Sequence, residues 1–306
     1  TTAVGREQLK IARDFVKVPS NYNNYFSEYN LKYYEMKNTV VYGDTDSIFV
    51  KFDARDENCN ILSDKEALVK SIHIAEWTEK QIGEQELESP QILEYEKTFY
   101  PFILLGKKKY IGMKYEKAND NPKQSNMGVV LKRRDNALIL KIIYDSIINK
   151  LITERTELGL KEFLYEQVDE LIKGPDGKYD ISKLTITKRL NEEYKDRTKI
   201  AHAVLADRIG IRDPGNKPNS GDRIQFVYID VESDEKVLQG DKIETPEYIL
   251  DSNNGIKIDY KFYISNQLSK PIGQLFAIFN LENVFDKDTI DKINKNYNNK
   301  IENYVE

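Results

Sequence analysis

Two aspartates, Asp44 and Asp46, stand two positions apart between two short apolar runs. The alternation of residue types over positions 39–52 predicts two β-strands joined by a tight turn at Gly43. Residues two apart in an extended strand project from the same face, so we expect both carboxylates at the tip of this hairpin. Paired carboxylates in a turn attract a hard divalent cation such as Mg²⁺, which leaves room for substrate phosphates.

The aspartate pair has a second interpretation, because Asp is common in turns, where its side chain bonds nearby backbone N–H groups. Two-metal phosphoryl or nucleotidyl transfer holds ions about 3.5–4 Å apart, and we expect it to need at least one further carboxylate. Glu94 and Glu96, in a predicted strand over residues 92–99, are the candidates for that ligand. An ion-paired surface acid is nevertheless the favoured interpretation of both.

The basic residues concentrate in one window, although the 306-residue chain has a net charge of −5. Residues 97–134 contain ten Lys or Arg against Glu116 and Asp120, which makes this window +8 and the remainder −13. Such a patch attracts a polyanion to one surface. Lysines supply point charges for phosphates, and a tyrosine stacks on bases or donates its hydroxyl. Two groups carry these side chains, with a solvated charge run as the alternative for each: Lys107, Lys108, Lys109 and Tyr110, then Lys132, Arg133 and Arg134.

Helical and strand patterns divide the chain into a mixed first part and a mostly helical second part, so the expected fold class is α+β. In the first part we expect a helix over residues 1–16 and a second helix that a capping box of Ser63 and Glu66 opens and that ends near Gln85. Strands are expected over residues 92–99, 102–105, 109–115 and 128–131. The second part predicts helices over residues 137–152, 158–172, 200–209, 260–268 and 271–279, with strands over 183–187 and 223–231.

Composition restricts the classes of protein that fit. A single cysteine, Cys59, excludes an internal disulfide framework and indicates a reducing, intracellular compartment. No apolar run is long enough to span a membrane, so we expect no membrane partner. The chain shows no signal peptide and begins with Thr rather than Met, so we expect a fragment or a processed piece.

Three segments, in this order, resemble family B DNA polymerases. The string Tyr-Gly-Asp-Thr-Asp-Ser at residues 42–47 is similar to the palm signature called motif C. Residues 107–110 are similar to the Lys-Lys-x-Tyr segment, and residues 128–135 to the Gly-x-x-x-Lys-Arg-Arg-Asp segment. Weaker similarities at residues 2–7, 185–188, 201–206, 221–224 and 258–271 extend the resemblance over nearly the whole chain. Residues 263–276 look more like the polymerases of large DNA viruses than cellular ones.

The resemblance implies an antiparallel palm sheet with packed helices over residues 1–131 and a mostly helical thumb over residues 132–306. It implies template-dependent addition of dNMP to a primer 3′ end with two Mg²⁺ ions. Asp46 would be the firm metal ligand, with Asp44 beside it. Other roles implied are support of the active site by Tyr42, Gly43, Thr45 and Ser47, primer contacts by Lys107, Lys108, Lys109 and Tyr110, and phosphate contacts by Lys132, Arg133 and Arg134.

Three parts of a family B polymerase have no counterpart in this chain: motif A with its aspartate, the fingers segment that grips dNTP, and the exonuclease domain. We therefore expect the chain to be inactive alone. The expected partners are primer–template DNA, dNTP, the missing N-terminal part and a processivity factor. A viral source would place it in the nucleus or at a cytoplasmic replication site. Two alternatives are a non-catalytic duplex-binding module and a Mg²⁺-dependent phosphatase or nuclease, which the helical half and the basic groups fit poorly.

Overall fold

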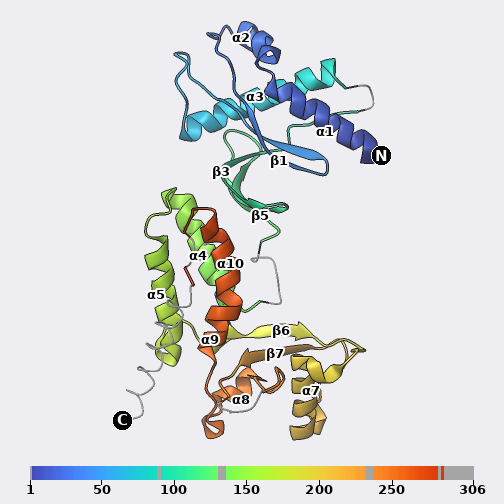
Figure 1. Ribbon diagram of the computed structural model, residues 1–306, viewed down its shortest axis with the longest axis vertical. Helices are drawn as coiled ribbons and strands as arrows, with labels where there is room; N and C mark the ends of the chain where they lie inside the picture. The colour runs from blue at the N-terminus through green and yellow to red at the C-terminus, as the bar shows by residue number, and fades with distance from the viewer. Residues whose placement is uncertain (1, 88–90, 130–135, 232–236, 282–283, 286–306) are drawn as a thin grey trace. The chain divides into compact units, whose positions relative to one another are not determined.

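The computed structural model describes residues 2–87, 91–129, 136–231, 237–281 and 284–285. These residues form two compact units divided after Gly128 (Figure 1). Each unit is built from helices and antiparallel sheets, which confirms the expected α+β class. The predicted boundary between residues 131 and 132 falls outside the described residues. Within the described part, no helix has the length and apolarity needed to cross a membrane.

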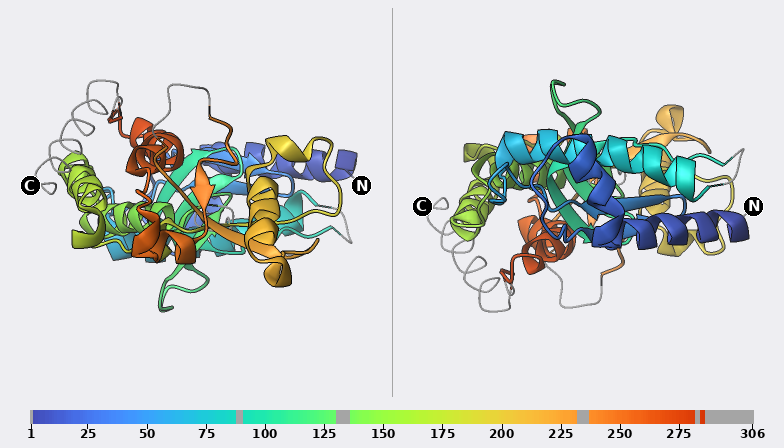
Figure 2. Two further views of the ribbon diagram at one scale, coloured as in Figure 1. Left: turned by 90° about the horizontal axis from the view of Figure 1, so that it is seen from below. Right: turned by 90° about the horizontal axis from the view of Figure 1, so that it is seen from above.

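Four helical segments form one side of unit 1: α1 (Thr2–Lys17), the 3₁₀ turn η1 (Pro19–Tyr22), α2 (Asn23–Glu28) and α3 (Asp64–Gln85). Helices α1 and α3 are those expected from the apolar spacing, although Ser63 forms no capping hydrogen bond with its side chain. The two helices contact each other, and both can be followed in the view from above, α1 in dark blue and α3 in light blue to cyan (Figure 2). Tyr22, Tyr25, Phe26 and Trp77 make an aromatic core between α2 and α3.

Strands β1 (Thr39–Asp44) and β2 (Ser47–Lys51) form the expected hairpin. It lies between the helices and a three-stranded antiparallel sheet of unit 1 (Figure 1). On the helical side, Val40, Ile48 and Val50 pack against a second core built from residues of α1 and α3. Burial of these side chains removes apolar surface from water, which contributes roughly 25 cal/mol for each Å².

The three-stranded sheet has the order β3–β4–β5 and consists of β3 (Thr98–Gly106), β4 (Lys109–Tyr115) and β5 (Lys123–Met127). The prediction of a strand over residues 92–99 was wrong for residues 92–97, which have no regular secondary structure. There the N–H of Tyr95 donates to the side chain of Glu79 on α3 rather than to a neighbouring strand (2.9 Å). Of the strand expected over residues 128–131, residues 128 and 129 are not in a strand, since β5 ends at Met127 and Gly128 turns the chain with a φ of +61°. Residues 130 and 131 lie outside the described residues.

Unit 2 contains a group of helices and a second three-stranded sheet of order β6–β7–β8. Helices α4 and α5 pack together through leucine and isoleucine side chains of their apolar faces. The strand expected over residues 183–187 is instead a short helix followed by β6, while the remaining helices lie close to their predicted positions. The elements are α4 (Leu138–Glu154), α5 (Leu160–Ile172), α6 (Ile181–Leu184), β6 (Ile186–Arg189), α7 (Ala201–Arg212), β7 (Arg223–Tyr228), β8 (Ile243–Glu244), α8 (Pro246–Leu250), α9 (Tyr260–Phe262), the π-helix η7 (Tyr263–Leu268) and α10 (Ser269–Ala277).

Candidate active site

The turn of the β1–β2 hairpin centres on Thr45 and Asp46, two residues later than the predicted turn at Gly43. Gly43 lies within β1 opposite Ile48, and Asp44 lies opposite Ser47. The N–H of Asp46 donates to the carbonyl oxygen of Asp44, and Thr45 adopts a left-handed φ of +46°. Asp44 therefore ends a strand, whereas Asp46 sits in the turn itself. The acidic turn, as we call residues 44–47, still brings both aspartates to the tip.

A β-bulge in β1 determines which of its side chains face the helices and which face the β3–β5 sheet. Val40 lies opposite Val50 and Tyr42 opposite Phe49, which leaves Val41 as the extra residue. A bulge reverses the alternation of side chains at the point of insertion. Val40 consequently faces α1, while Tyr42 and, two residues on, Asp44 face the β3–β5 sheet. Without the bulge, Val40 and Tyr42 would face the same side of the hairpin. Tyr42 and Asp44 could then not face the sheet while Val40 faces α1.

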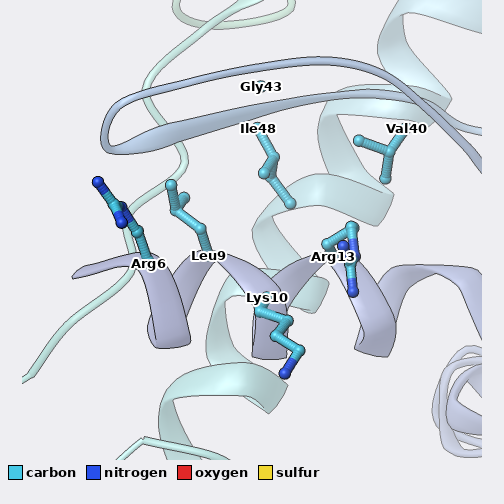
Figure 3. Close-up of a pocket in the computed structure, with 7 residues that line it drawn as sticks. All are labelled: Arg6, Leu9, Lys10, Arg13, Val40, Gly43 and Ile48. Carbon is cyan, nitrogen blue, oxygen red and sulfur yellow. The ribbon is translucent and has the colours of Figure 1, made fainter. Parts of the chain in front are cut away.

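The helix-facing side of the hairpin borders an open groove of about 340 Å³ (Figure 3). Figure 3 shows Val40 and Ile48 pointing from the hairpin toward α1, and Leu9 pointing back from α1 toward the hairpin. Lys10 points away from the hairpin in the same view and forms an ion pair with Glu7 (3.7 Å). Neither aspartate lines this groove, so the candidate site lies elsewhere on the hairpin.

An aromatic cluster holds the opposite side of the hairpin against the β3–β5 sheet. The ring of Phe49 lies 5.3–6.1 Å from those of Phe99, Phe102 and Tyr110, measured between centroids. Tyr42 packs beside Phe49 at 5.3 Å. Tyr110 is only 8% exposed. Its ring is thus a packing element of the cluster rather than free to stack on a base, and a contact of its hydroxyl with the primer stays a prediction.

The β3–β4 hairpin turns at Lys107 and Lys108, with Gly106 paired opposite Lys109. All three lysines are exposed. Lys108 has a φ of +57°, and its N–H donates to the hydroxyl of Tyr42 (2.7 Å). Gly128 closes on this turn from the other side, since a Cβ placed on it would lie 2.0 Å from the carbonyl oxygen of Lys108. The lysine turn, residues 106–109, is therefore held against the acidic turn.

An ion pair joins the two turns directly. The Lys108 ammonium lies 3.0 Å from the Asp44 carboxylate, whose side chain is 17% exposed. The hydrogen bond from Lys108, aided by that from the Thr45 hydroxyl, lowers the pKa of Asp44. The same bond is the main cause that raises the pKa of Lys108, to which the negative charge of Asp46 also contributes. Both aspartates thus act on one cation at the tip.

The donor chemistry of the acidic turn suits Mg²⁺, since it presents two carboxylates, one of which already pairs with a cation. Among the described residues, no group of three or more His, Cys, Asp or Glu is placed to hold a metal ion. Glu94 and Glu96 therefore do not complete the site. Glu96 forms an ion pair with Lys97, and Glu94 is exposed in the irregular segment before β3. Within the part of the chain that the structure describes, the acidic turn thus presents two carboxylates with no third metal-binding side chain beside them.

Some predicted site residues could not be placed, and others were missed. Lys132, Arg133 and Arg134 lie outside the described residues. Sequence reasoning missed Phe49, the hydrophobic anchor of the hairpin, and the pairing of Lys108 with Asp44. The signal for Phe49 was present as an aromatic residue on the face of β2 opposite Ile48 and Val50. No local pattern predicted the ion pair, because its members are far apart in the chain.

The family model of DNA polymerase family B matches residues 1–279 of this chain. The chain is 47% identical over 279 residues to the DNA polymerase of Pyramimonas orientalis virus, covering 91% of this chain and 21% of that protein. It is 42% identical over 264 residues to the DNA polymerase of Acanthamoeba polyphaga mimivirus, covering 84% and 15% respectively. Against the DNA polymerase delta catalytic subunit of Schizosaccharomyces pombe the identity is 31% over 280 residues, with 90% and 23% covered.

A solved structure shares the fold. The family B DNA polymerase from the hyperthermophilic archaeon Pyrobaculum calidifontis matches with a TM-score of 0.57 and 19% sequence identity. The match covers 89% of this chain and 29% of that one. The chain thus spans between 15% and 23% of the three sequence relatives described above and under a third of the structural one.

Proposed function

The chain belongs to DNA polymerase family B, and we propose on that basis that it is the C-terminal palm and thumb portion of a DNA-directed DNA polymerase. Unit 1 would be the palm part and unit 2 the thumb. The observation that carries the proposal is the meeting of the acidic turn and the lysine turn, joined by the pair of Asp44 and Lys108 (3.0 Å). Carboxylates for a metal and cations for a phosphate backbone thereby lie on one face of unit 1.

The proposed roles follow from the contacts of each side chain. Asp44 and Asp46 would hold Mg²⁺, while exposed Lys107 and Lys109 would bind primer phosphates as point charges. Two Mg²⁺ ions bound at such a site would stabilise the attacking and leaving oxygens during nucleotidyl transfer. Thr45 and Ser47 support the turn, since their hydroxyls donate to the side chain and the carbonyl oxygen of Asp44. Lys132, Arg133 and Arg134 keep their proposed contacts with backbone phosphates.

The third carboxylate would come from a part of the protein outside these 306 residues, together with the surface that grips dNTP. Two observations support this. The described residues offer no third ligand beside the aspartates, and the relatives are several times longer than the matched region. The two viral relatives are more similar to this chain than the delta subunit is, so we include a large DNA virus as the source. An intracellular replication site and a processivity factor belong to the same proposal.

The test is a pair of substitutions in the enzyme reconstituted from this chain and the part that precedes it. Asp46→Ala should reduce nucleotide incorporation by at least about 10³-fold, because the metal site loses a ligand. Its affinity for primer–template DNA should change little. Asp56→Ala is the matched control, since Asp56 also caps a turn of unit 1 and accepts hydrogen bonds from backbone N–H groups (2.8 Å). Full activity of Asp46→Ala would overturn the assignment, and DNA binding without incorporation by the unsubstituted enzyme would favour a non-catalytic duplex-binding module.

A further inference from the structure

The lysine turn is built from residues that do not favour its backbone conformation. Two-residue hairpin turns prefer Asn-Gly or similar pairs, because positive φ is unfavourable for most side chains. Here the two positions are Lys107 and Lys108, and Lys108 has a φ of +57°. Its side chain cannot form the local hydrogen bonds by which Asn tolerates this region. The turn therefore needs support from outside its own hairpin.

That support comes from Tyr42 on β1. Its hydroxyl oxygen accepts the hydrogen bond of the Lys108 N–H at 2.7 Å. Its ring is held in place by packing, since its centroid lies 5.3 Å from that of Phe49 and 6.4 Å from that of Tyr110. A fixed ring fixes the position of its hydroxyl, so the acceptor is held in place for the lysine turn.

Lys108 forms two separate contacts with β1. While its backbone bonds to Tyr42, its ammonium pairs with Asp44, two residues further along the same strand. The ion pair is partly exposed, with 57% of the lysine side chain accessible, so water and salt weaken it. The directional bond to the Tyr42 hydroxyl is consequently the contact that sets the geometry of the turn.

We propose that Tyr42 is a positioning residue, which acts through its hydroxyl to hold the lysine turn in register with the acidic turn. This inference rests on the proposed function, because it assigns the lysines to the primer strand. Tyr42 itself touches no reacting group. Its effect passes through the Lys108 backbone to the exposed ammonium groups of Lys107 and Lys109, whose directions the turn determines.

The first experiment compares Tyr42→Phe with Tyr34→Phe in the full chain. Both remove one hydroxyl from unit 1, and that of Tyr34 donates to the carbonyl oxygen of Asp53 (2.7 Å), far from the lysine turn in sequence. Amide hydrogen exchange at Lys108 should accelerate at least tenfold in Tyr42→Phe and remain unchanged in Tyr34→Phe. Unchanged exchange at Lys108 in Tyr42→Phe would overturn the proposal, whatever the DNA measurements show.

The second experiment measures affinity for a recessed primer–template against a blunt duplex of the same length. Tyr42→Phe should reduce the preference of the chain for the primer–template about three- to tenfold. An equal loss in Tyr34→Phe would show general loosening and overturn the positioning role. If the unsubstituted chain has no such preference, the proposed primer contact fails, and the exchange experiment still reports on Tyr42.

A double-mutant cycle separates positioning from a general effect on folding. Lys108→Asn makes the turn more tolerant of positive φ. In that background, Tyr42→Phe should change the preference for the recessed primer–template less than twofold. A loss as large as in the unsubstituted chain would show that the hydroxyl does not act through the conformation of residue 108, and would overturn the proposal.

Discussion

At the scale of single residues, one cation explains much of the candidate site. Lys108 brings a positive charge to two aspartates, and its pairing lowers the pKa of Asp44. Lys108 thus favours the charged form of the Asp44 carboxylate and holds it in place. No local sequence pattern predicts this contact. Within the described part of the chain, Lys107 and Lys109 form no ion pair with the acidic turn, and these are the lysines that we propose for DNA.

Lys107→Ala should weaken binding of primer–template DNA by reducing the number of phosphates that the chain neutralises. The slope of log K against log salt concentration should become shallower by about 1. Fluorescence anisotropy over a series of salt concentrations measures this slope. Lys65→Ala, which removes an exposed lysine from the first turn of α3, should leave it unchanged. Equal slopes for Lys107→Ala and the unsubstituted chain would remove Lys107 from the DNA interface.

His202 in unit 2 predicts a dependence of stability on pH. Burial lowers the pKa of His202, whose ring nitrogen lies 3.2 Å from the Tyr194 hydroxyl and from the carbonyl oxygen of Arg189. The unfolded chain then binds the proton more tightly than the folded chain, so the free energy of unfolding should fall as the pH drops below about 6.5. Far-UV circular dichroism in denaturant should show this decline, and a shallower one in His202→Gln. Identical pH profiles would contradict the prediction.

At the scale of elements, the meeting of two hairpins depends on a glycine that belongs to neither of them. Gly128 combines a φ of +61° with a close approach to the Lys108 carbonyl, so a side chain there meets both backbone strain and steric overlap. We expect Gly128→Ala to lower the free energy of unfolding by at least about 3 kcal/mol. Gly255 has a φ of +59° with open space around it. Gly255→Ala should therefore cost only about 1 kcal/mol, and equal losses in denaturant titrations would refute the steric argument.

The aromatic cluster is the element-scale counterpart of the Tyr42 contact. Phe49→Ala removes the ring that joins the hairpin to the β3–β5 sheet and should lower the free energy of unfolding by about 3 kcal/mol. Val41→Ala should cost below about 1 kcal/mol, because Val41 is exposed at the bulge. The only tryptophan, Trp77, is buried in the core of unit 1, so its fluorescence follows this unfolding. A small effect of Phe49→Ala would show that other contacts hold the hairpin.

At the scale of the whole molecule, the chain has two compact units, and its described residues contain no group of three or more His, Cys, Asp or Glu that could hold a metal ion. We expect the isolated 306-residue chain to bind primer–template DNA without extending the primer. A gel assay with Mg²⁺ and dNTPs measures extension, and the reconstituted enzyme is its positive control. Extension by the isolated chain would disprove the need for a carboxylate from elsewhere in the protein.

The sequence by itself determined the elements whose patterns are local. Apolar spacing predicted α1, α3, α4 and α5, and alternation predicted the β1–β2 hairpin and the strands over residues 102–105 and 109–115, which lie in β3 and β4. These predictions succeed because the spacing of apolar residues that is typical of a helix or a strand can be recognised within one short segment. The string around Asp44 and Asp46 likewise indicated the family, because its residue types and their spacing are contained in one short segment.

Only the tertiary structure decided which residues meet. Tyr42 and Lys108 are 66 positions apart, and their contact depends on the bulge at Val41 and on the packing of Phe49. The same packing buries Tyr110, which by type alone is a base-stacking candidate. Glu94 and Glu96 are not placed as metal ligands, because their segment is not a strand of the sheet. The N–H of Tyr95 between them donates to the side chain of Glu79 on α3 instead. Contacts between distant segments arise from burial of whole faces, and no local period encodes them.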